Sequence, residues 1–149
     1  MSRLATERMT LEQAEEQILS SDRWLRNILA RVGSRATVRP GMKVLDVGAA
    51  QGRTLIALDR RGFEAYGVEP ADEARQVACE LAAREGCHIV IEAGTAESLP
   101  FAADTFDLVI ATSVMEHVVD LERSLAEIHR VLRPGGMFWF NSASAMSPF

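Results

Sequence analysis

The 149-residue sequence lacks the features that mark several specialised classes of protein. It has no apolar run near the ~20 residues of a membrane-spanning helix, and its polar N-terminus lacks the apolar core of a secretory signal. Its net charge of −5 and its scattered arginines provide no basic surface for a nucleic-acid backbone. We therefore expect a cytoplasmic protein that binds neither membrane nor nucleic acid.

Cysteine is also scarce, with only Cys79 and Cys87 in the chain. The two form no C-x-x-C pair, and no histidine stands where it would complete a zinc site. We expect two buried, reduced thiols and no bound metal. The chain also has no internal repeat or low-complexity segment. Its content of 48% hydrophobic and 25% charged residues indicates one globular domain over residues 1–149.

Residues 1–39 are expected to form an N-terminal helical segment. Thr10 and Gln13 have the spacing of a capping box at a helix start. Apolar residues then recur at helical spacing, at Leu11, Ala14, Ile18, Leu25, Ile28 and Val32. The stretch 33–41 is the nearest thing to a linker and leads into a core of residues 40–149.

In this core, short apolar runs alternate with amphipathic helical runs. Strands are expected at 43–47, 63–69, 88–92, 106–111 and 137–140, and helices at 53–61, 71–85 and 120–132. The last helix carries Leu121, Leu125, Ile128 and Leu132 on one face. Such alternation predicts an α/β fold, a doubly wound parallel sheet with helices on both faces. In this class ligands bind beyond the carboxyl ends of the strands, where the winding direction reverses.

The strand and turn over residues 43–53 are the most informative part of the chain. The strand ends near Asp46, and Gly48 and Gly52 follow, four positions apart, where the backbone can turn tightly and approach a ligand. A dinucleotide turn, G-x-G-x-x-G, would require glycine at positions 50 and 53, which are alanine and arginine here. Asp46 disfavours a diphosphate and favours a cationic or zwitterionic ligand. The run therefore predicts a nucleotide ligand without phosphates.

The pattern Asp46-x-Gly48-x-x-x-Gly52 resembles motif I of the class I S-adenosylmethionine-dependent methyltransferases. Ala49 and Ala50 lie where many relatives have a cysteine and a further glycine. The resemblance extends over residues 40–140 and is strongest to the methyltransferase type 11 and quinone-biosynthesis group. It implies a Rossmann-like sheet of strand order 3-2-1-4-5, with S-adenosylmethionine as cofactor and S-adenosylhomocysteine as product. It also implies that all five of these residues contact the cofactor.

Glu69 closes the second expected strand, 21 positions after Gly48. An acidic side chain at that place can accept hydrogen bonds from the hydroxyls of a ribose. A solvated carboxylate at a strand end is the alternative interpretation. Taken together with Asp46 and Gly48, Glu69 favours ribose binding, and we assign the adjacent Pro70 to the same site.

The segment 94–101 is similar to the family's G-D-A-x-x-L-P-F segment, which holds adenine. Thr95 takes the place of the family's aspartate, and its hydroxyl would bond the exocyclic amine more weakly than a carboxylate. The resemblance therefore assigns Thr95, the backbone of Ala96 and the side chain of Glu97 to the adenine site. Residues 99–101 are expected to pack.

Two further segments match the same family. Residues 111–118 are similar to the segment beneath the methionine group, from which we assign Thr112 as a cofactor contact. His117 is either a proton acceptor or, as we prefer, a hydrogen-bonded structural residue. Residues 130–136 match the turn R-x-L-K/R-P-G-G that precedes the fifth strand.

Arg53 is expected at the surface, although the amides at its helix start could meet the methionine carboxylate. Trp24 is expected to pack, or to lie over the pocket.

The resemblance implies methyl transfer by in-line displacement to a small-molecule acceptor, and we assign no catalytic residue. One alternative is a cofactor-binding fragment or regulatory module without turnover. A nicotinamide-dependent oxidoreductase comes third, disfavoured by Ala50 and Arg53. Relatives continue beyond the fifth strand with a helix and two more strands. We therefore expect either a truncated chain or an apolar edge strand at 137–140 that a partner covers, as in a homodimer.

Overall fold

The computed structural model describes residues 11–141, in which one long helix is followed by alternating strands and helices. The elements are α1 (Leu11–Gly33), β1 (Lys43–Val47), α2 (Arg53–Arg60), β2 (Glu64–Val68), α3 (Asp72–Glu85), β3 (Ile89–Glu92), β4 (Phe106–Thr112), α4 (Leu121–Val131) and β5 (Leu132–Asn141). Every predicted element is present, and only β5 departs clearly from its predicted bounds. The predicted cap residue Thr10 lies outside the described residues.

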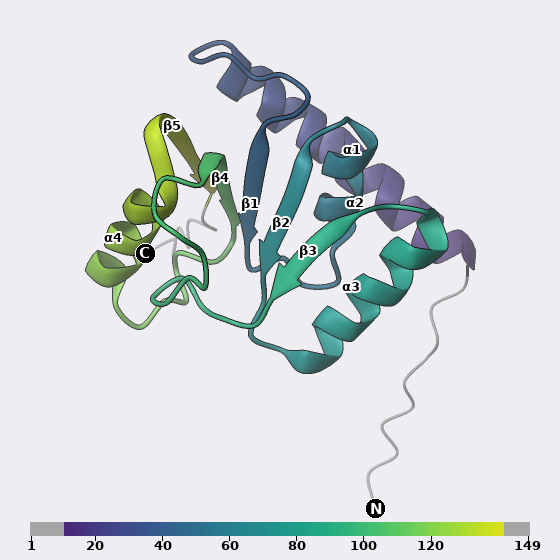
Figure 1. Cartoon of the computed structure of the whole chain (residues 1–149). Helices are drawn as coiled ribbons and strands as arrows, with labels where there is room; N and C mark the ends of the chain where they lie inside the picture. The colour runs from purple at the N-terminus through teal and green to yellow at the C-terminus, as the bar shows by residue number, and fades with distance from the viewer. Residues whose placement is uncertain (1–10, 142–149) are drawn as a thin grey trace, which may run out of the picture.

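All five strands are parallel and lie in the order β3-β2-β1-β4-β5, which confirms the predicted topology (Figure 1). β1 is central, with Val44 opposite Ala65 of β2 on one side and Leu108 of β4 on the other. The chain winds outward from β1 to β3 and then crosses back to β4. The winding direction therefore reverses between β1 and β4, and a ligand site is expected at their carboxyl ends.

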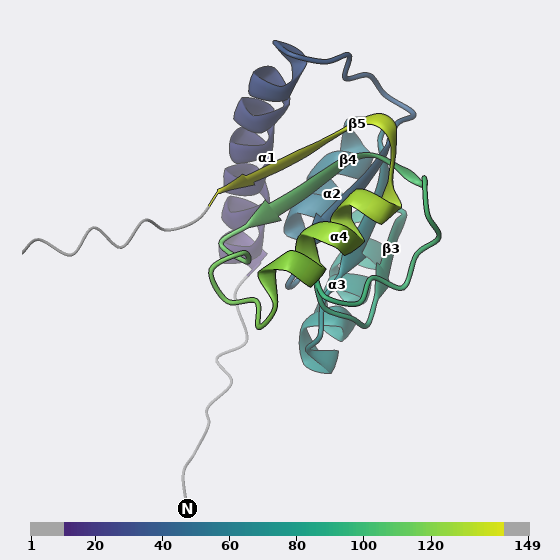
Figure 2. The same ribbon diagram turned by 90° about the vertical axis from the view of Figure 1, so that its left-hand side faces the viewer.

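Helices cover the two faces of the sheet unequally. α1, α2 and α3 lie on one face and α4 lies on the other (Figure 2). The residues of β1 alternate between the two cores, because successive side chains of a strand point to opposite faces: Val44 packs with α1 and α2, and Leu45 and Val47 pack with α4. The face that α4 covers is the one that meets the loops after β3 and β4.

The predicted apolar stripe of α1 is confirmed where its side chains are described. Ile18, Leu25, Ile28 and Val32 are buried. The side chains of Leu11 and Ala14 lie outside the described residues.

The predicted stripe of α4 is only partly correct. Ile128 is buried, but Leu121 and Leu125 are 51% and 44% exposed, and Ser124 is fully buried in their place. Ser124 can be buried because its hydroxyl donates to the backbone oxygen of Asp120. Leu132 lies in β5 and not in the helix.

The expectation of two buried thiols is wrong. Cys79 is exposed and Cys87 is partly exposed. Cys79 lies on the side of α3 that faces solvent, whereas Ala78 and Leu81 face the core. Helical periodicity, and not the apolar character of the thiol, decides which of these residues is buried.

β5 begins five residues earlier than predicted. Leu132 already pairs with Phe106, and pairing resumes at Met137 opposite Leu108, so residues 133–136 form an irregularity within the strand. Pro134 lacks a backbone donor and Gly135 has φ of +81°, so neither suits a regular ladder. The segment predicted as a turn before the strand is therefore a bulge inside it.

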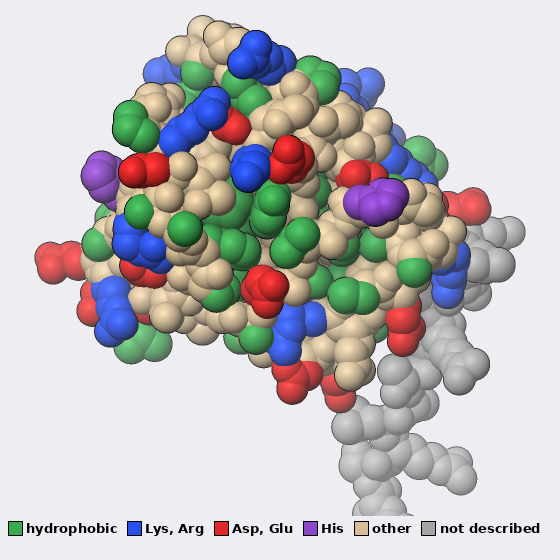
Figure 3. Space-filling view, in the orientation of Figure 1, with side chains coloured by type: hydrophobic (Ala, Val, Ile, Leu, Met, Phe, Trp, Pro, Cys, Tyr) green, Lys and Arg blue, Asp and Glu red, His purple; other side chains and the backbone are tan. Residues whose placement is uncertain are grey.

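No helix of the described chain lies in front of β2 and β3 in Figure 1. In the same orientation, Figure 3 shows hydrophobic side chains at the centre of this face, with acidic and basic side chains interspersed around them. Val90 of β3 is 41% exposed.

Candidate functional site

The loop after β1 forms the floor of the site. Gly48, Ala50 and Gly52 all have positive φ, at +75°, +48° and +75°. The amides of Gly48 and Ala49 both donate to the carbonyl oxygen of Val68, at 2.9 and 3.0 Å, which ties the loop to the end of β2. Gly52 then starts α2, and the amide of Ile56 donates to its carbonyl oxygen. A turn this tight favours glycine wherever φ is positive.

The larger of two cavities at the carboxyl ends of β1 and β4 has a volume of about 430 Å³. It brings together Asp46, Gly48, Ala49, Ala50 and Thr112, five of the residues predicted to contact the cofactor. Six further residues line it: Ser20, Ser21, Trp24, Gln51, Arg53 and Thr54.

Asp46 is an acidic residue of this cavity whose pKa is strongly raised. Its side chain is buried, with only 6% of the residue exposed. Burial, and next the negative charge of Glu69, raise the pKa of Asp46 to about 7. A carboxylate in this position gains from any cation that enters the cavity, because the cation offsets both effects.

Thr112, the last residue of β4, faces the same cavity as Asp46. Its Oγ1 is buried and has no hydrogen-bond partner among residues 11–141. A buried hydroxyl without a partner is costly, so its presence beside a cavity indicates a place for a polar ligand atom.

The smaller cavity, of about 220 Å³, adjoins the first, because Gly48 lines both. It gathers the remaining predicted contacts Pro70, Thr95, Ala96 and Glu97. Its apolar wall consists of Val47, Val68, Val114, Val118 and Val119. A mostly apolar cavity of this kind suits a flat heterocycle.

Polar groups of the smaller cavity are partly engaged with one another. The carboxylate Oε1 of Glu97 accepts from the amide of Val119 at 2.7 Å and from that of Asp120 at 3.4 Å. The pKa of Glu97 is lowered first by its own backbone amide, against the opposing effect of burial. The amides of Val119 and Asp120 and the hydroxyl of Thr95 lower it further. Glu97 therefore links the two loops that border the cavity.

Two predicted contacts, Glu69 and Gly52, line neither cavity. The carboxylate of Glu69 accepts from the amide of Ala50 at 2.9 Å and from that of Ala71 at 3.0 Å, so it holds the loop after β1. Gly52 faces α3, where a Cβ would lie 2.7 Å from the Cβ of Ala78. The glycine at position 52 is therefore explained by close packing of α2 on α3.

Arg53 is half-buried and lines the larger cavity, although it was predicted at the surface. Its guanidinium donates to Oε1 of Gln51, and burial lowers its pKa from the ordinary value. Arg53 and Thr54 begin α2, where the first amides of a helix have no partner within it. Arg53 and the start of α2 therefore border the same cavity as the Asp46 carboxylate.

Three residues of α1 reach the larger cavity, and the sequence interpretation missed two of them. Trp24 was expected to pack, with a place over the pocket as the alternative, whereas Ser20 and Ser21 were not considered. Trp24 also packs edge-on against Trp139 of β5, with ring centroids 5.8 Å apart. Ser20 and Trp24 are four apart and share a helix face, which is the sequence signal that could have identified this wall.

His117 lines the smaller cavity and not the one that contains Asp46. Its side chain is exposed and its amide donates to the carbonyl oxygen of Val114 at 2.9 Å. His117 thus lies outside the cavity that contains Asp46, and both interpretations of its role stay predictions.

Residues 11–141 contain neither a metal-binding cluster nor a membrane-spanning helix. No group of three or more His, Cys, Asp or Glu side chains is arranged to hold a metal ion in this part of the chain. None of the helices within the same range has the length and apolar character needed to cross a membrane.

Residues 45–140 match the family described as "Methyltransferase domain". The chain is similar to YcgJ of Bacillus subtilis (strain 168), an uncharacterized methyltransferase, with 36% identity over 104 residues that cover 69% of this chain and 41% of YcgJ. The crystal structure of YcgJ superposes with a TM-score of 0.68 and 32% identity, over 77% of this chain and 50% of that one.

Two further relatives have names that describe a substrate or pathway. A ubiquinone biosynthesis O-methyltransferase of Rhizobium etli (strain CIAT 652) is 34% identical over 99 residues, which cover 66% of this chain and 40% of the relative. A geranyl diphosphate methyltransferase in complex with GPP and sinefungin superposes with a TM-score of 0.65 and 25% identity, over 70% of this chain and 39% of that one. The chain spans about two fifths of the length of the curated relatives it matches.

Proposed function

Because the chain belongs to the methyltransferase domain family, we propose that its cleft binds S-adenosylmethionine and that the protein transfers the methyl group to a small-molecule acceptor. The observation that carries this proposal is the shared cavity of Asp46 and Thr112, in which a buried carboxylate and a buried hydroxyl without a partner in residues 11–141 border the same space. A zwitterionic amino acid group would satisfy both.

The residues of the larger cavity fit the methionine end of the cofactor. The carboxylate of Asp46 would accept hydrogen bonds from the ammonium, and the hydroxyl of Thr112 has a free donor and free acceptor sites for a polar atom. The amides that begin α2 and the cation of Arg53 would bind the cofactor carboxylate.

The smaller cavity fits the adenosine end. Its apolar wall would cover the faces of the adenine, and the polar groups of Thr95 and Ala96 would meet its edge. Glu69 binds the amide of Ala50, which lines the larger cavity. Each of its carboxylate oxygens accepts one amide, which leaves further lone pairs for the ribose hydroxyls.

The sulfonium of the bound cofactor supplies an electrophilic methyl group that is already activated by its positive charge. The residues of this chain would therefore act by positioning and by excluding water, which is where most of the rate acceleration of such a transfer arises. Among the described residues that line the larger cavity, only Asp46 has the character of a general base, and we assign Asp46 to the ammonium.

A small-molecule acceptor is supported by the names of two relatives, a ubiquinone biosynthesis O-methyltransferase and a geranyl diphosphate methyltransferase. The larger cavity has the additional wall of Ser20, Ser21 and Trp24 from α1. An aromatic surface flanked by hydroxyls suits a partly apolar acceptor beside the methyl group.

We also propose that a second copy of the chain pairs with the outer edge of β5. Within residues 11–141, β5 pairs only with β4, and Phe140 at its end is 52% exposed. Phe138 and Phe140 stack with centroids 5.2 Å apart on one face of this edge. Strand edges of this kind favour pairing with another chain. Light scattering behind a sizing column would detect the dimer, and a monomer at all concentrations would contradict it.

The function is tested by calorimetric titration of the chain with S-adenosylhomocysteine and, separately, with NAD. We expect S-adenosylhomocysteine to bind and NAD not to bind. Asp46→Asn should weaken binding about tenfold or more, because a charge-assisted hydrogen bond is lost. Asp59→Asn, on the far end of α2, is the matched control and should bind like the unmodified chain. Binding of NAD alone would overturn the proposal.

Turnover is tested with a panel of phenols, amines and carboxylates and with radiolabelled S-adenosylmethionine. Methyl transfer to any of them supports the enzymatic function. Cofactor binding without any transfer would favour the alternative of a binding or regulatory module.

A further inference from the structure

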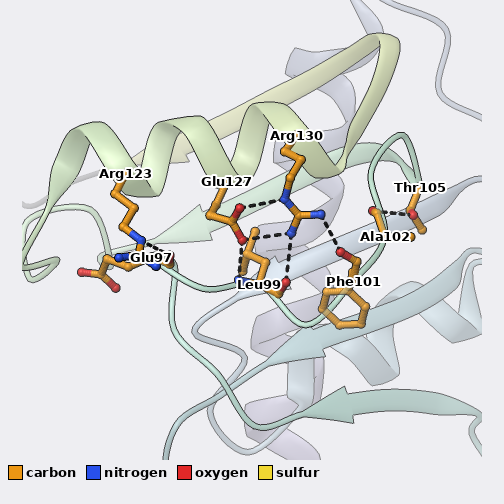
Figure 4. A network of polar contacts seen from close by, with 8 residues as sticks. All are labelled: Glu97, Leu99, Phe101, Ala102, Thr105, Arg123, Glu127 and Arg130. Carbon is orange, nitrogen blue, oxygen red and sulfur yellow. Dashed lines mark hydrogen bonds and ion pairs between the residues drawn. The ribbon is translucent and has the colours of Figure 1, made fainter.

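The loop between β3 and β4 is held from outside by α4. Glu127 accepts a hydrogen bond from the amide of Leu99 at 2.8 Å. Arg130 donates to the carbonyl oxygen of Leu99 at 3.0 Å and to that of Phe101 at 2.8 Å (Figure 4). Two side chains, one helical turn apart, thus bind three backbone groups of the loop.

The two side chains also bind each other. Nε of Arg130 lies 2.7 Å from Oε1 of Glu127, and its Nη2 lies 2.9 Å from Oε2. Arg130, and then the amide of Leu99, lower the pKa of Glu127 to about 2, so the pair stays charged at neutral pH. The guanidinium is planar, so this two-point contact fixes the direction in which Arg130 reaches the loop.

A second tie runs through Arg123, one helical turn before Glu127. Its Nε donates to the carbonyl oxygen of Glu97 at 2.9 Å. The carboxylate of Glu97 in turn accepts from the amides of Val119 and Asp120, which precede α4. The loop is therefore joined to α4 at both ends of the segment 97–101, and the helix itself begins at the cap formed by Asp120.

The inner side of the same loop is a wall of the smaller cavity. Thr95, Ala96 and Glu97 line it, and Ala96 is buried. The backbone of the loop contributes a tight turn in which the amide of Ser98 donates to the carbonyl oxygen of Thr95 at 3.1 Å. The contacts of α4 to Glu97, Leu99 and Phe101 tie the backbone of this wall, and the segment that follows it, to the helix.

We propose that Glu127 and Arg130 are positioning residues. They set the location of the wall that residues 95–97 form in the smaller cavity, and thereby the preference of the site for adenine over other bases. The proposal rests on the function proposed above. Neither residue lines either of the two cavities, so both would act through residues 95–97.

The test compares binding of S-adenosylhomocysteine with that of S-inosylhomocysteine, in which the exocyclic amine is replaced by oxygen. Arg130→Met removes the donors to Leu99 and Phe101. We expect it to weaken S-adenosylhomocysteine binding about tenfold and to reduce the preference between the two ligands, because donors of charged groups are lost. Arg130→Lys keeps the charge, and its affinity and ligand preference should lie between those of the unmodified chain and Arg130→Met.

Arg61→Met is the matched control. Arg61 forms an ion pair of the same two-point kind with Asp22, at 2.9 and 3.0 Å, between α2 and α1. A loss of thermal stability similar to that of Arg130→Met, with unchanged ligand preference, would distinguish positioning from a general loss of stability. Glu127→Gln retains an acceptor for Leu99 and provides a second variant if Arg130→Met does not fold.

An unchanged ligand preference in both Arg130→Met and Glu127→Gln would overturn the inference while leaving the proposed function intact. Failure of the unmodified chain to bind S-adenosylhomocysteine would instead overturn the proposed function. Hydrogen exchange further separates positioning of the loop from a general loss of stability. Arg130→Met should speed exchange of the backbone amides from Thr95 to Leu99, and Arg61→Met should not.

Discussion

The side chain of Val114 occupies the space that a side chain at Gly48 would need. A Cβ built on Gly48 would lie 2.5 Å from Cγ2 of Val114, closer than such atoms approach in proteins. Gly48 also has φ of +75° and lines both cavities. The loop after β4 therefore packs, through the side chain of Val114, directly on the backbone of Gly48 where the cavities join.

Gly48→Ala is expected to destabilise the chain and to abolish detectable binding of S-adenosylhomocysteine. The positive φ alone costs about 1 kcal/mol for a residue with a Cβ, and the overlap with Val114 adds about 1–3 kcal/mol. Urea unfolding and calorimetric titration would measure the two effects.

Gly41→Ala separates conformational cost from overlap, because Gly41 has φ of +88° and a Cβ there would meet no atom within 4 Å. The loss of unfolding free energy in Gly41→Ala should equal only the part of the Gly48→Ala effect that arises from positive φ. Gly48→Ala combined with Val114→Ala should recover part of the loss. Equal effects of the two glycine substitutions would contradict the importance of the contact.

Thr112→Val is expected to leave the unliganded chain as stable as before, or more stable by about 1 kcal/mol, and yet to weaken cofactor binding. Its Oγ1 is buried without a partner in the described part of the chain, so the replacement by a methyl group removes an unmet hydrogen-bonding requirement. Thermal unfolding with and without S-adenosylhomocysteine would reveal opposite signs. A loss of stability in the free chain would contradict this explanation.

The architecture was predictable because it depends on local patterns. Alternating strands and helices determine a doubly wound sheet almost by themselves, and right-handed crossovers then allow few strand orders. The loop over residues 48–52 was predictable for the same reason, since its glycines directly follow a buried strand.

The remaining features depend on tertiary contacts that no local pattern encodes. Periodicity identifies the buried stripe of α1, but not that Ser20 and Ser21 would lie beside the ends of β1 and β4. Motif position likewise identifies Glu69 and Gly52, but not that one binds the amide of Ala50 and the other faces α3. The register shift of β5 arises from its pairing with β4, which the sequence of β5 alone does not contain.

Glu69→Gln is expected to weaken S-adenosylhomocysteine binding about tenfold and to lower the pKa of Asp46. The amide has one acceptor oxygen in place of two, so it cannot hold both Ala50 and Ala71 and also meet a ribose. The loss of its negative charge removes one of the two causes that raise the pKa of Asp46. Comparison with a cofactor analogue lacking the ribose hydroxyls would isolate the ribose contribution, and equal losses for both ligands would contradict it.

Binding of S-adenosylhomocysteine is expected to strengthen as the pH rises toward 7. The ammonium of the ligand pairs with the ionised form of Asp46, whose pKa is raised to about 7 in the free chain. Below that pH, binding must displace a proton, so affinity should change about tenfold per pH unit. The same titration of Asp46→Asn should lack this slope, and a parallel slope in both chains would contradict the role of Asp46.

Asp46→Asn is expected to stabilise the free chain at pH 8 and to have little effect at pH 4. The folded pKa of about 7 lies above the ordinary value of 3.8, so the folded chain holds a proton that the unfolded chain releases between these values. Stability must therefore fall as the pH rises through this window, by an upper bound of about 4 kcal/mol. Urea unfolding of both chains from pH 4 to 8 isolates Asp46, because the three histidines are common to both. Parallel curves for the two chains would contradict a buried, proton-binding carboxyl at the end of β1.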